Sequence, residues 1–149
     1  MLRLLIIAHA PLASALKAVA AHIDPDAADA IAVFDVDASH SVEDVVAAVS
    51  PRLGGPDAQP TLILTDVFGA TPCNAAQRLG ERALTRVVAG VNVPVLWRAL
   101  GHLSDPLDTT AELVVAGGQQ GVMHVTVTRP QYQTLAPTLH DSIHDHHQQ

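Results

Sequence analysis

The sequence is poor in the residues that several functional classes require. Its one cysteine, Cys73, excludes an intramolecular disulfide and favours a reducing compartment. A single lysine and a net charge of −7 argue against nucleic-acid binding through phosphate neutralisation. The apolar runs are too short to span a membrane, and Arg3 alone makes a poor start for a signal peptide. We therefore expect a cytoplasmic protein without membrane insertion.

Two nucleotide-binding motifs are also missing. The sequence contains neither G-x-G-x-x-G after its first apolar run nor G-x-x-x-x-G-K-[ST]. What it does contain is a large apolar fraction, 48% of 149 residues, with 15% charged residues and 3% aromatics. This composition predicts one globular domain with a core rich in alanine and valine.

Short apolar strands alternate with helical patterns along the chain. Strands are predicted over 2–8, 30–36, 61–65 and 85–89, and helices over 12–23, 42–49, 71–80, 92–103 and 107–119. Ser41 and Thr71 resemble helix caps, and Pro11 and Pro72 suit a first helical turn. The alternation predicts an α/β fold with a doubly wound parallel sheet.

The end of the chain follows a different pattern. Residues 121–128 alternate like an edge strand, whereas 129–149 are polar, rich in histidine and without periodicity. We predict a domain over 1–128 and a His-rich tail over 129–149. In that tail, His140 and His144 have the spacing of a metal site on a helix, although a solvated tail is the simpler interpretation.

Polar residues follow the apolar strands at points where a parallel sheet would gather them. His9 follows the first strand, Asp66 follows the third, and Gly90-Val91-Asn92 follows the fourth. Ligands of open α/β sheets bind beyond the carboxyl ends of the strands, where the strand order reverses. If the order is 2-1-3-4, His9 and Asp66 face each other. Each residue alone has an ordinary structural explanation, so the hypothesis depends on their convergence.

A carboxylate beside an imidazole indicates nucleophilic or proton-transfer chemistry. The carboxylate holds the proton on one ring nitrogen and leaves a lone pair on the other, which can attack phosphorus. The Thr71 hydroxyl and the free N–H groups at the starts of the 71–80 and 12–23 helices would bind the phosphoryl oxygens. Ala10 has no side chain to cap the 12–23 helix.

Other interpretations of the same residues stay open. Cys73 at a helix start could act with His9 as a thiol or metal hydrolase, although a buried thiol is the simpler interpretation. Asp66 as the phosphoacceptor of a response regulator would need an acidic pair after the first strand, where the chain has Ala8-His9. Trp97 suits either a packed helix or a subunit interface.

Three motifs in order resemble one known family. They are Ile6-Ile7-Ala8-His9, then Leu64-Thr65-Asp66-Val67-Phe68-Gly69-Ala70-Thr71-Pro72-Cys73-Asn74-Ala75-Ala76, then Val88-Ala89-Gly90-Val91-Asn92-Val93-Pro94-Val95-Leu96. The combination resembles the mannose-family enzyme IIA components of the bacterial phosphoenolpyruvate-dependent phosphotransferase system, over about residues 1–127.

The resemblance implies a specific fold and function. It implies four parallel strands plus one antiparallel strand, here 121–127, exchanged in a homodimer. By the same resemblance, His9 accepts a phosphoryl group on Nε2 from the phosphocarrier HPr, Asp66 orients the ring, and Thr71 lies near the phosphoryl group. A histidine of a IIB partner then receives the group, with no metal or small cofactor. The family's usual Thr-His-Gly is replaced here by Ala8-His9-Ala10.

Two uses of this chemistry remain open from the sequence. In the first, the protein is a phosphoryl carrier between HPr and IIB. In the second, it is a regulatory binding protein without sugar transport, in which phosphorylation of His9 changes the surface charge and switches binding to a kinase or other effector.

Overall fold

The computed structural model describes residues 1–55 and 58–127. In this part of the chain, four parallel strands form one sheet in the order β2-β1-β3-β4. The strands are β1 (Arg3–His9), β2 (Ile31–Val36), β3 (Thr61–Thr65) and β4 (Thr85–Ala89). This order confirms the predicted 2-1-3-4 arrangement and makes β1 and β3 neighbours.

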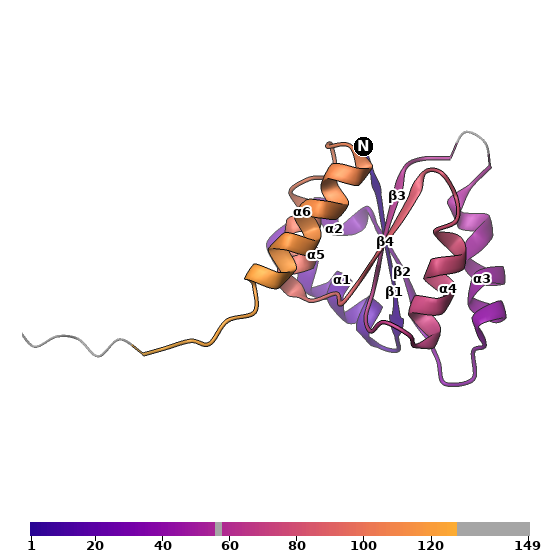
Figure 1. Ribbon diagram of the computed structural model, residues 1–149, viewed down its shortest axis with the longest axis horizontal. Helices are drawn as coiled ribbons and strands as arrows, with labels where there is room; N and C mark the ends of the chain where they lie inside the picture. The colour runs from indigo at the N-terminus through magenta and orange to yellow at the C-terminus, as the bar shows by residue number, and fades with distance from the viewer. Residues whose placement is uncertain (56–57, 128–149) are drawn as a thin grey trace, which may run out of the picture.

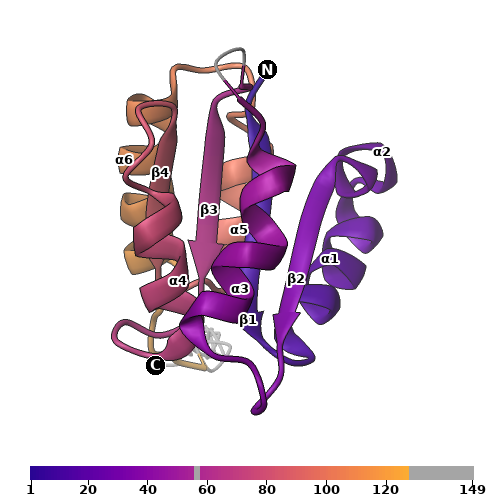
Figure 2. The same cartoon turned by 90° about the vertical axis from the view of Figure 1, so that its right-hand side faces the viewer.

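Helices cover both faces of the sheet. One face carries α1 (Leu12–Ile23), α2 (Pro25–Asp29), α5 (Val93–Leu100) and α6 (Leu107–Gln120); the other carries α3 (Val42–Val49) and α4 (Thr71–Leu79) (Figure 1). Figure 2 shows α3 and α4 in front of the sheet, whose four strands run in the same direction. None of the described helices is long and apolar enough to cross a membrane.

The central strand β1 is buried on both sides. Leu4 and Ile6 belong to the core under α1, α5 and α6, whereas Leu5 and Ile7 belong to the core under α3 and α4. Each of these side chains is at most 1% exposed. This double burial explains why the strand is a continuous apolar run rather than an alternating one. Because β1 is packed on both faces, the position of His9 at its end is held by the core.

Helix starts and ends follow the sequence signals with some exceptions. Ser41 and Asp44 form the predicted capping box at the start of α3. The first helix ends at Ile23, as predicted, with Asp24 as its C-cap. The prediction missed α2, because the Asp24 side chain also accepts the Ala27 N–H and caps a second helix directly after the first. It also missed the 3₁₀ helix η1 (Ser50–Leu53). The helix expected to reach residue 103 ends at Leu100, where Gly101 forms the cap.

The predicted fifth strand does not form within the single chain. Residues 122–127 have no regular secondary structure, and Figure 1 shows this segment leading away from the sheet. Its apolar side chains are exposed, Val125 by 79% and Val127 by 88%. A strand requires a neighbour for its backbone groups, and this segment has none among residues 1–55 and 58–127. The predicted tail over 129–149 lies outside the described residues.

The start of α1 has an unexpected polar partner. Asp35, the one carboxylate of β2, accepts hydrogen bonds from the Ser14 backbone N–H (3.1 Å) and from the Ser14 hydroxyl. No side chain of the capping residue Pro11 serves this helix end. The expectation that the first N–H groups of α1 are all free is therefore wrong at Ser14, because a carboxylate from the neighbouring strand takes the place of a cap.

We predict that Asp35→Ala lowers the free energy of unfolding by about 1 kcal/mol, the usual cost of a lost helix cap. Urea unfolding followed by circular dichroism would measure the change. Asp35→Asn is the matched control, since its amide oxygen still accepts a hydrogen bond and should preserve most of the stability. Equal stability of Asp35→Ala and the wild type would show that Asp35 does not support α1.

Candidate functional site

His9 and Asp66 meet at the carboxyl edge of the sheet, as the strand order predicts. His9 is the last residue of β1, and Asp66 directly follows β3. The ring Nδ1 of His9 lies 2.6 Å from Oδ2 of Asp66, and the His9 backbone N–H donates to the same oxygen at 2.8 Å. The His9 side chain is 52% exposed, whereas that of Asp66 is 12% exposed. The carboxylate is thus placed below an accessible ring.

The contact fixes the tautomer of the imidazole. An ionised carboxylate only accepts hydrogen bonds, so Nδ1 of His9 must carry the proton that points to Asp66. In the neutral ring the other nitrogen, Nε2, then has a free lone pair. Because half of the ring is exposed, this arrangement suits a nucleophile that reacts with a group brought by a partner molecule.

The environment of Asp66 keeps it ionised. Its partial burial raises the pKa of the carboxyl group, but hydrogen bonds from the His9 backbone, the His9 ring and the Val67 backbone outweigh this effect. The pKa of Asp66 consequently lies below its ordinary value. The Val67 N–H donates to Oδ1 at 2.8 Å, so both carboxylate oxygens accept hydrogen bonds.

The loop after β4 supports Asp66 from the far side. The Gly90 N–H donates to the Asp66 carbonyl oxygen at 2.7 Å, and the Val91 N–H donates to the Thr65 carbonyl oxygen at 2.9 Å. Gly90 has a φ of 90°, a conformation that other residues rarely adopt. The predicted convergence of three loops is therefore confirmed, and the third loop acts through backbone hydrogen bonds.

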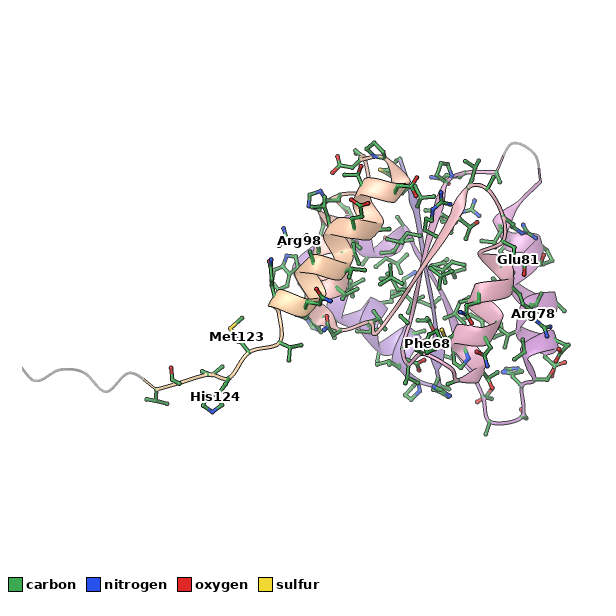
Figure 3. All side chains as sticks on the ribbon, in the orientation of Figure 1. Phe68, Arg78, Glu81, Arg98, Met123 and His124 are labelled. Carbon is green, nitrogen blue, oxygen red and sulfur yellow. The ribbon has the colours of Figure 1, made fainter. Side chains whose placement is uncertain are left out.

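The loop between β3 and α4, which begins with Asp66, presents exposed apolar side chains at the sheet edge that carries His9. Phe68 is 75% exposed and Val67 is 54% exposed. Figure 3 shows Phe68 in the loop at the lower end of the sheet, near the start of α4. The loop is held by the Asn74 side chain, whose amide donates to the Gly69 carbonyl oxygen at 3.1 Å. This hydrogen bond was not predicted, although Asn74 lies within the second of the three motifs.

Thr71 has a different local role from the one predicted. It is the first residue of α4, and the capping residue is Ala70, so no side-chain hydrogen bond caps this helix. The prediction that Thr71 caps α4 is wrong, because the helix begins at Thr71 itself, one residue earlier than a Thr71 cap requires. Thr71 is half-buried at the same sheet edge as His9 and Asp66. The uncapped helix start is a suitable place for an anion.

Cys73 is unsuited to the alternative nucleophilic role. Its side chain is 1% exposed and belongs to the buried face of α4. A thiol that attacks a substrate must be accessible and able to ionise. The structure thus favours the interpretation of Cys73 as a core residue.

The loops at the edge that contains His9 carry no lysine or arginine in the described part of the chain. No lysine or arginine occurs in the four loops that follow the strands, residues 10–11, 37–41, 66–70 and 90–92. Asp35, Asp37 and Asp66 lie at or next to this edge. The surface around His9 is therefore acidic, with Val67 and Phe68 as an apolar contact beside it.

The fold and site define a class of protein, an α/β protein with a doubly wound parallel sheet and a histidine–aspartate pair at its switch point. The family model for the fructose IIA component of the phosphotransferase system (PTS) matches residues 3–129. The chain belongs to this EIIA family, as the resemblance in its motifs indicated. No curated protein sequence matches the chain.

Solved structures of the same family share the fold. The mannose/sorbose-specific IIA subunit from Enterococcus faecalis is 27% identical with a TM-score of 0.78, covering 85% of this chain and 96% of that one. An EIIA component from Streptococcus agalactiae is 22% identical with a TM-score of 0.74, covering 83% and 97%. A IIA protein associated with a fucose utilization operon of Streptococcus pneumoniae is 18% identical with a TM-score of 0.67, covering 83% and 92%.

We predict that Asp66 makes the stability of the protein depend on pH in acid. A carboxyl group whose pKa is lowered by folding stabilises the protein at pH values above its ordinary pKa of 3.8. This contribution is lost as the pH falls through the pKa of the folded state. Asp66→Asn should therefore lose less stability than the wild type between about pH 5 and about pH 3. Urea unfolding at both pH values measures this.

Comparing the two proteins removes the contribution of the other acidic groups. Glu43 and Asp44 also have lowered pKa values, from hydrogen bonds made by their own helix start and, for Glu43, by Arg78. Both residues remain in the variant. The same loss of stability in wild type and Asp66→Asn would show that the His9–Asp66 contact does not lower the carboxyl pKa.

Proposed function

We propose that this protein is a phosphoryl carrier that receives its phosphoryl group on His9. The observation that supports this most is the 2.6 Å contact between His9 Nδ1 and Asp66, which leaves Nε2 as the free nucleophile on an exposed ring. The donor is an HPr-type phosphocarrier, and a histidine of a IIB component is the acceptor. This function places the protein in the cytoplasm.

Transfer follows from the orientation of the ring. The lone pair of Nε2 forms a bond to phosphorus as the donor's phosphorus–nitrogen bond breaks, and the donor nitrogen keeps that electron pair. His9 then carries a positive charge shared over the ring, which the Asp66 carboxylate stabilises through the Nδ1 proton. Onward transfer reverses these steps, and the Nε2 lone pair is restored.

The transferred group needs hydrogen-bond donors, because its oxygens carry the developing charge. The uncapped start of α4 offers backbone N–H groups, and the Thr71 hydroxyl lies at the same helix start. We assign Thr71 as a second donor to the phosphoryl oxygens, and Asp66 as the residue that orients His9. A helix N-terminus supplies this stabilisation without a cation, which the acidic edge lacks.

The surface around His9 suits a protein partner better than a small free substrate. Phe68 and Val67 provide exposed apolar area next to the reacting histidine. The acidic surroundings favour a partner that brings positive charge, since complementary charge speeds association. A phosphocarrier with a basic and apolar surface around its own histidine would meet both conditions.

A regulatory use of the same site is the second candidate, and the acidic edge favours it. A phosphoryl group on His9 adds negative charge to a surface that already lacks lysine and arginine. Such a change would weaken binding to an acidic effector or strengthen binding to a basic one, for example a kinase. The two uses differ in whether a IIB component removes the phosphoryl group.

We further propose a homodimer in which the exposed segment 122–127 pairs with the partner's β4. Strand β4 is at the edge of the sheet, and two pockets of about 290 and 410 Å³ lie along β4 and α6. Val88 and Val115 line both pockets. Val125 and Val127 alternate with His124 and Thr126, as in a strand with one apolar face.

For the carrier function, we predict that phosphoenolpyruvate, enzyme I and HPr add one acid-labile phosphoryl group to the wild type and none to His9→Ala. The physical reason is that His9 combines an exposed ring, an oriented tautomer and a place at the sheet edge where the uncapped start of α4 can bind the phosphoryl oxygens. Intact-mass measurement before and after acid treatment reads the result directly. A label that persists in His9→Ala would remove His9 from the reaction.

His40→Ala is the matched control, because His40 lies at the same sheet edge but its Nδ1 accepts the Asp37 N–H instead of facing a carboxylate. It should be phosphorylated like the wild type. In the same assay, Asp66→Asn should slow phosphorylation at least about tenfold, because the wrong tautomer becomes populated. Release of the label to a cognate IIB component separates the carrier from the purely regulatory use.

For the dimer, we predict that Val125→Lys converts the protein from dimer to monomer, because a charge on the apolar face of the strand cannot be buried against α6. Size-exclusion chromatography with light scattering measures the mass. Thr126→Lys, on the opposite face, is the control and should stay dimeric. A monomeric wild type at micromolar concentration would contradict the strand exchange.

A further inference from the structure

A second pocket lies on the outer side of the α5–α6 pair. Its volume is about 520 Å³, within the range of small-molecule sites, and its lining includes Trp97, Arg98, Gly101, His102 and Gly117. None of these residues belongs to the loops that carry His9, Asp66 and Thr71. The pocket therefore has no part in the proposed phosphoryl transfer, and it combines an aromatic ring, a guanidinium group and an imidazole.

The imidazole in this pocket is held by its own carboxylate. His102 Nδ1 lies 2.7 Å from Oδ2 of Asp105, and the Asp105 N–H donates to the His102 carbonyl oxygen at 3.1 Å. The Thr110 hydroxyl donates to the same carbonyl oxygen at 3.1 Å. These contacts fix the turn between α5 and α6 and the ring within it. As at His9, the carboxylate leaves Nε2 to interact with another molecule.

Arg98 provides a cation that no carboxylate pairs with among the described residues. The ion pairs of the described residues involve His9, Arg78, Arg86 and His102, and Arg98 is in none of them. Its side chain lies across Gly117, where an added Cβ would come within 2.8 Å of Nε and 3.1 Å of Cγ. Figure 3 shows Arg98 on the outer surface beside α6. Gly117 thus makes room for the arginine stem, and the guanidinium stays available.

Trp97 adds a flat apolar surface to these polar groups. Trp97 is 56% exposed, so a large apolar ring is left in contact with water. Indole rings stack readily on other planar rings, and guanidinium groups bind phosphate and carboxylate oxygens. The combination on one pocket therefore matches a ligand that is planar at one end and anionic at the other.

We propose that this pocket binds a small planar anion, a heteroaromatic or aromatic ring that carries a phosphate or carboxylate, with a nucleoside monophosphate as its simplest form. The ring stacks on Trp97, and the anionic group contacts Arg98 and Nε2 of His102. The proposal stands on the pocket alone and does not depend on phosphorylation of His9.

The chain offers a direct probe, because Trp97 is its only tryptophan. Titration of the full-length protein with AMP should change the Trp97 fluorescence in a saturable way. Adenosine and inorganic phosphate, each with half of the chemistry, should bind at least about tenfold more weakly. No change of fluorescence with AMP up to about 10 mM, together with no heat in calorimetry, would overturn the proposal.

Two substitutions test the assigned groups while Trp97 stays in place. Arg98→Gln should weaken AMP binding at least about tenfold, because it removes a charge-assisted hydrogen bond. Arg78→Gln is the matched control: it removes the same charge from a site that pairs with Glu43 and should leave affinity unchanged. If both variants bind AMP equally more weakly, the effect comes from the overall charge of the protein, and Arg98 does not form a binding site.

Gly117→Ala gives an independent test of the geometry. It should weaken AMP binding by moving Arg98, while a helical Gly→Ala change ordinarily does not destabilise a fold. Urea unfolding would verify that the variant is folded. A folded Gly117→Ala with wild-type affinity would contradict the pocket as a ligand site.

Discussion

The site depends on one carboxylate, Asp66, and on the hydrogen bonds that it accepts. The His9 backbone, the His9 ring and the Val67 backbone all donate to it. These contacts join the end of β1 to the end of β3, and the strand order β2-β1-β3-β4 makes those two ends neighbours. A different order would separate His9 from Asp66, and the imidazole would have neither a fixed tautomer nor a counter-charge.

The charge distribution around this pair limits how an anion can be held. The loops at this edge contain carboxylates and no lysine or arginine among the described residues, so a phosphoryl group meets repulsion from a distance. Close contact must compensate, and backbone N–H groups at the start of α4 are the available donors. An acidic edge with local donors suits a group that is delivered by a partner and passed on, because tight retention would oppose release.

Periodicity and strand-end chemistry predicted the larger part of the fold and the central pair of the site. The four strands, the start of α3 and the His9–Asp66 contact follow from local patterns plus one topological rule. What the sequence could not provide depends on contacts between distant residues. Asp35 serves as a cap from another strand, and Gly90 supports Asp66 through its backbone. Thr71 was misplaced by one residue because Ala70 gives no side-chain signal for a cap.

Ala8-His9-Ala10, in place of the Thr-His-Gly usual in this family, has a structural interpretation. Ala8 is fully buried and belongs to the core shared with α1 and α5, so its side chain packs and does not face the exposed ring of His9. Ala10 donates its N–H to the Val36 carbonyl oxygen at 3.0 Å and so continues the pairing of β1 with β2. Neither alanine side chain has a polar atom to offer the His9 ring, whose Nδ1 is paired with Asp66. The orientation of His9 comes from Asp66 and from the strand that carries it, and both remain intact beside Ala8 and Ala10.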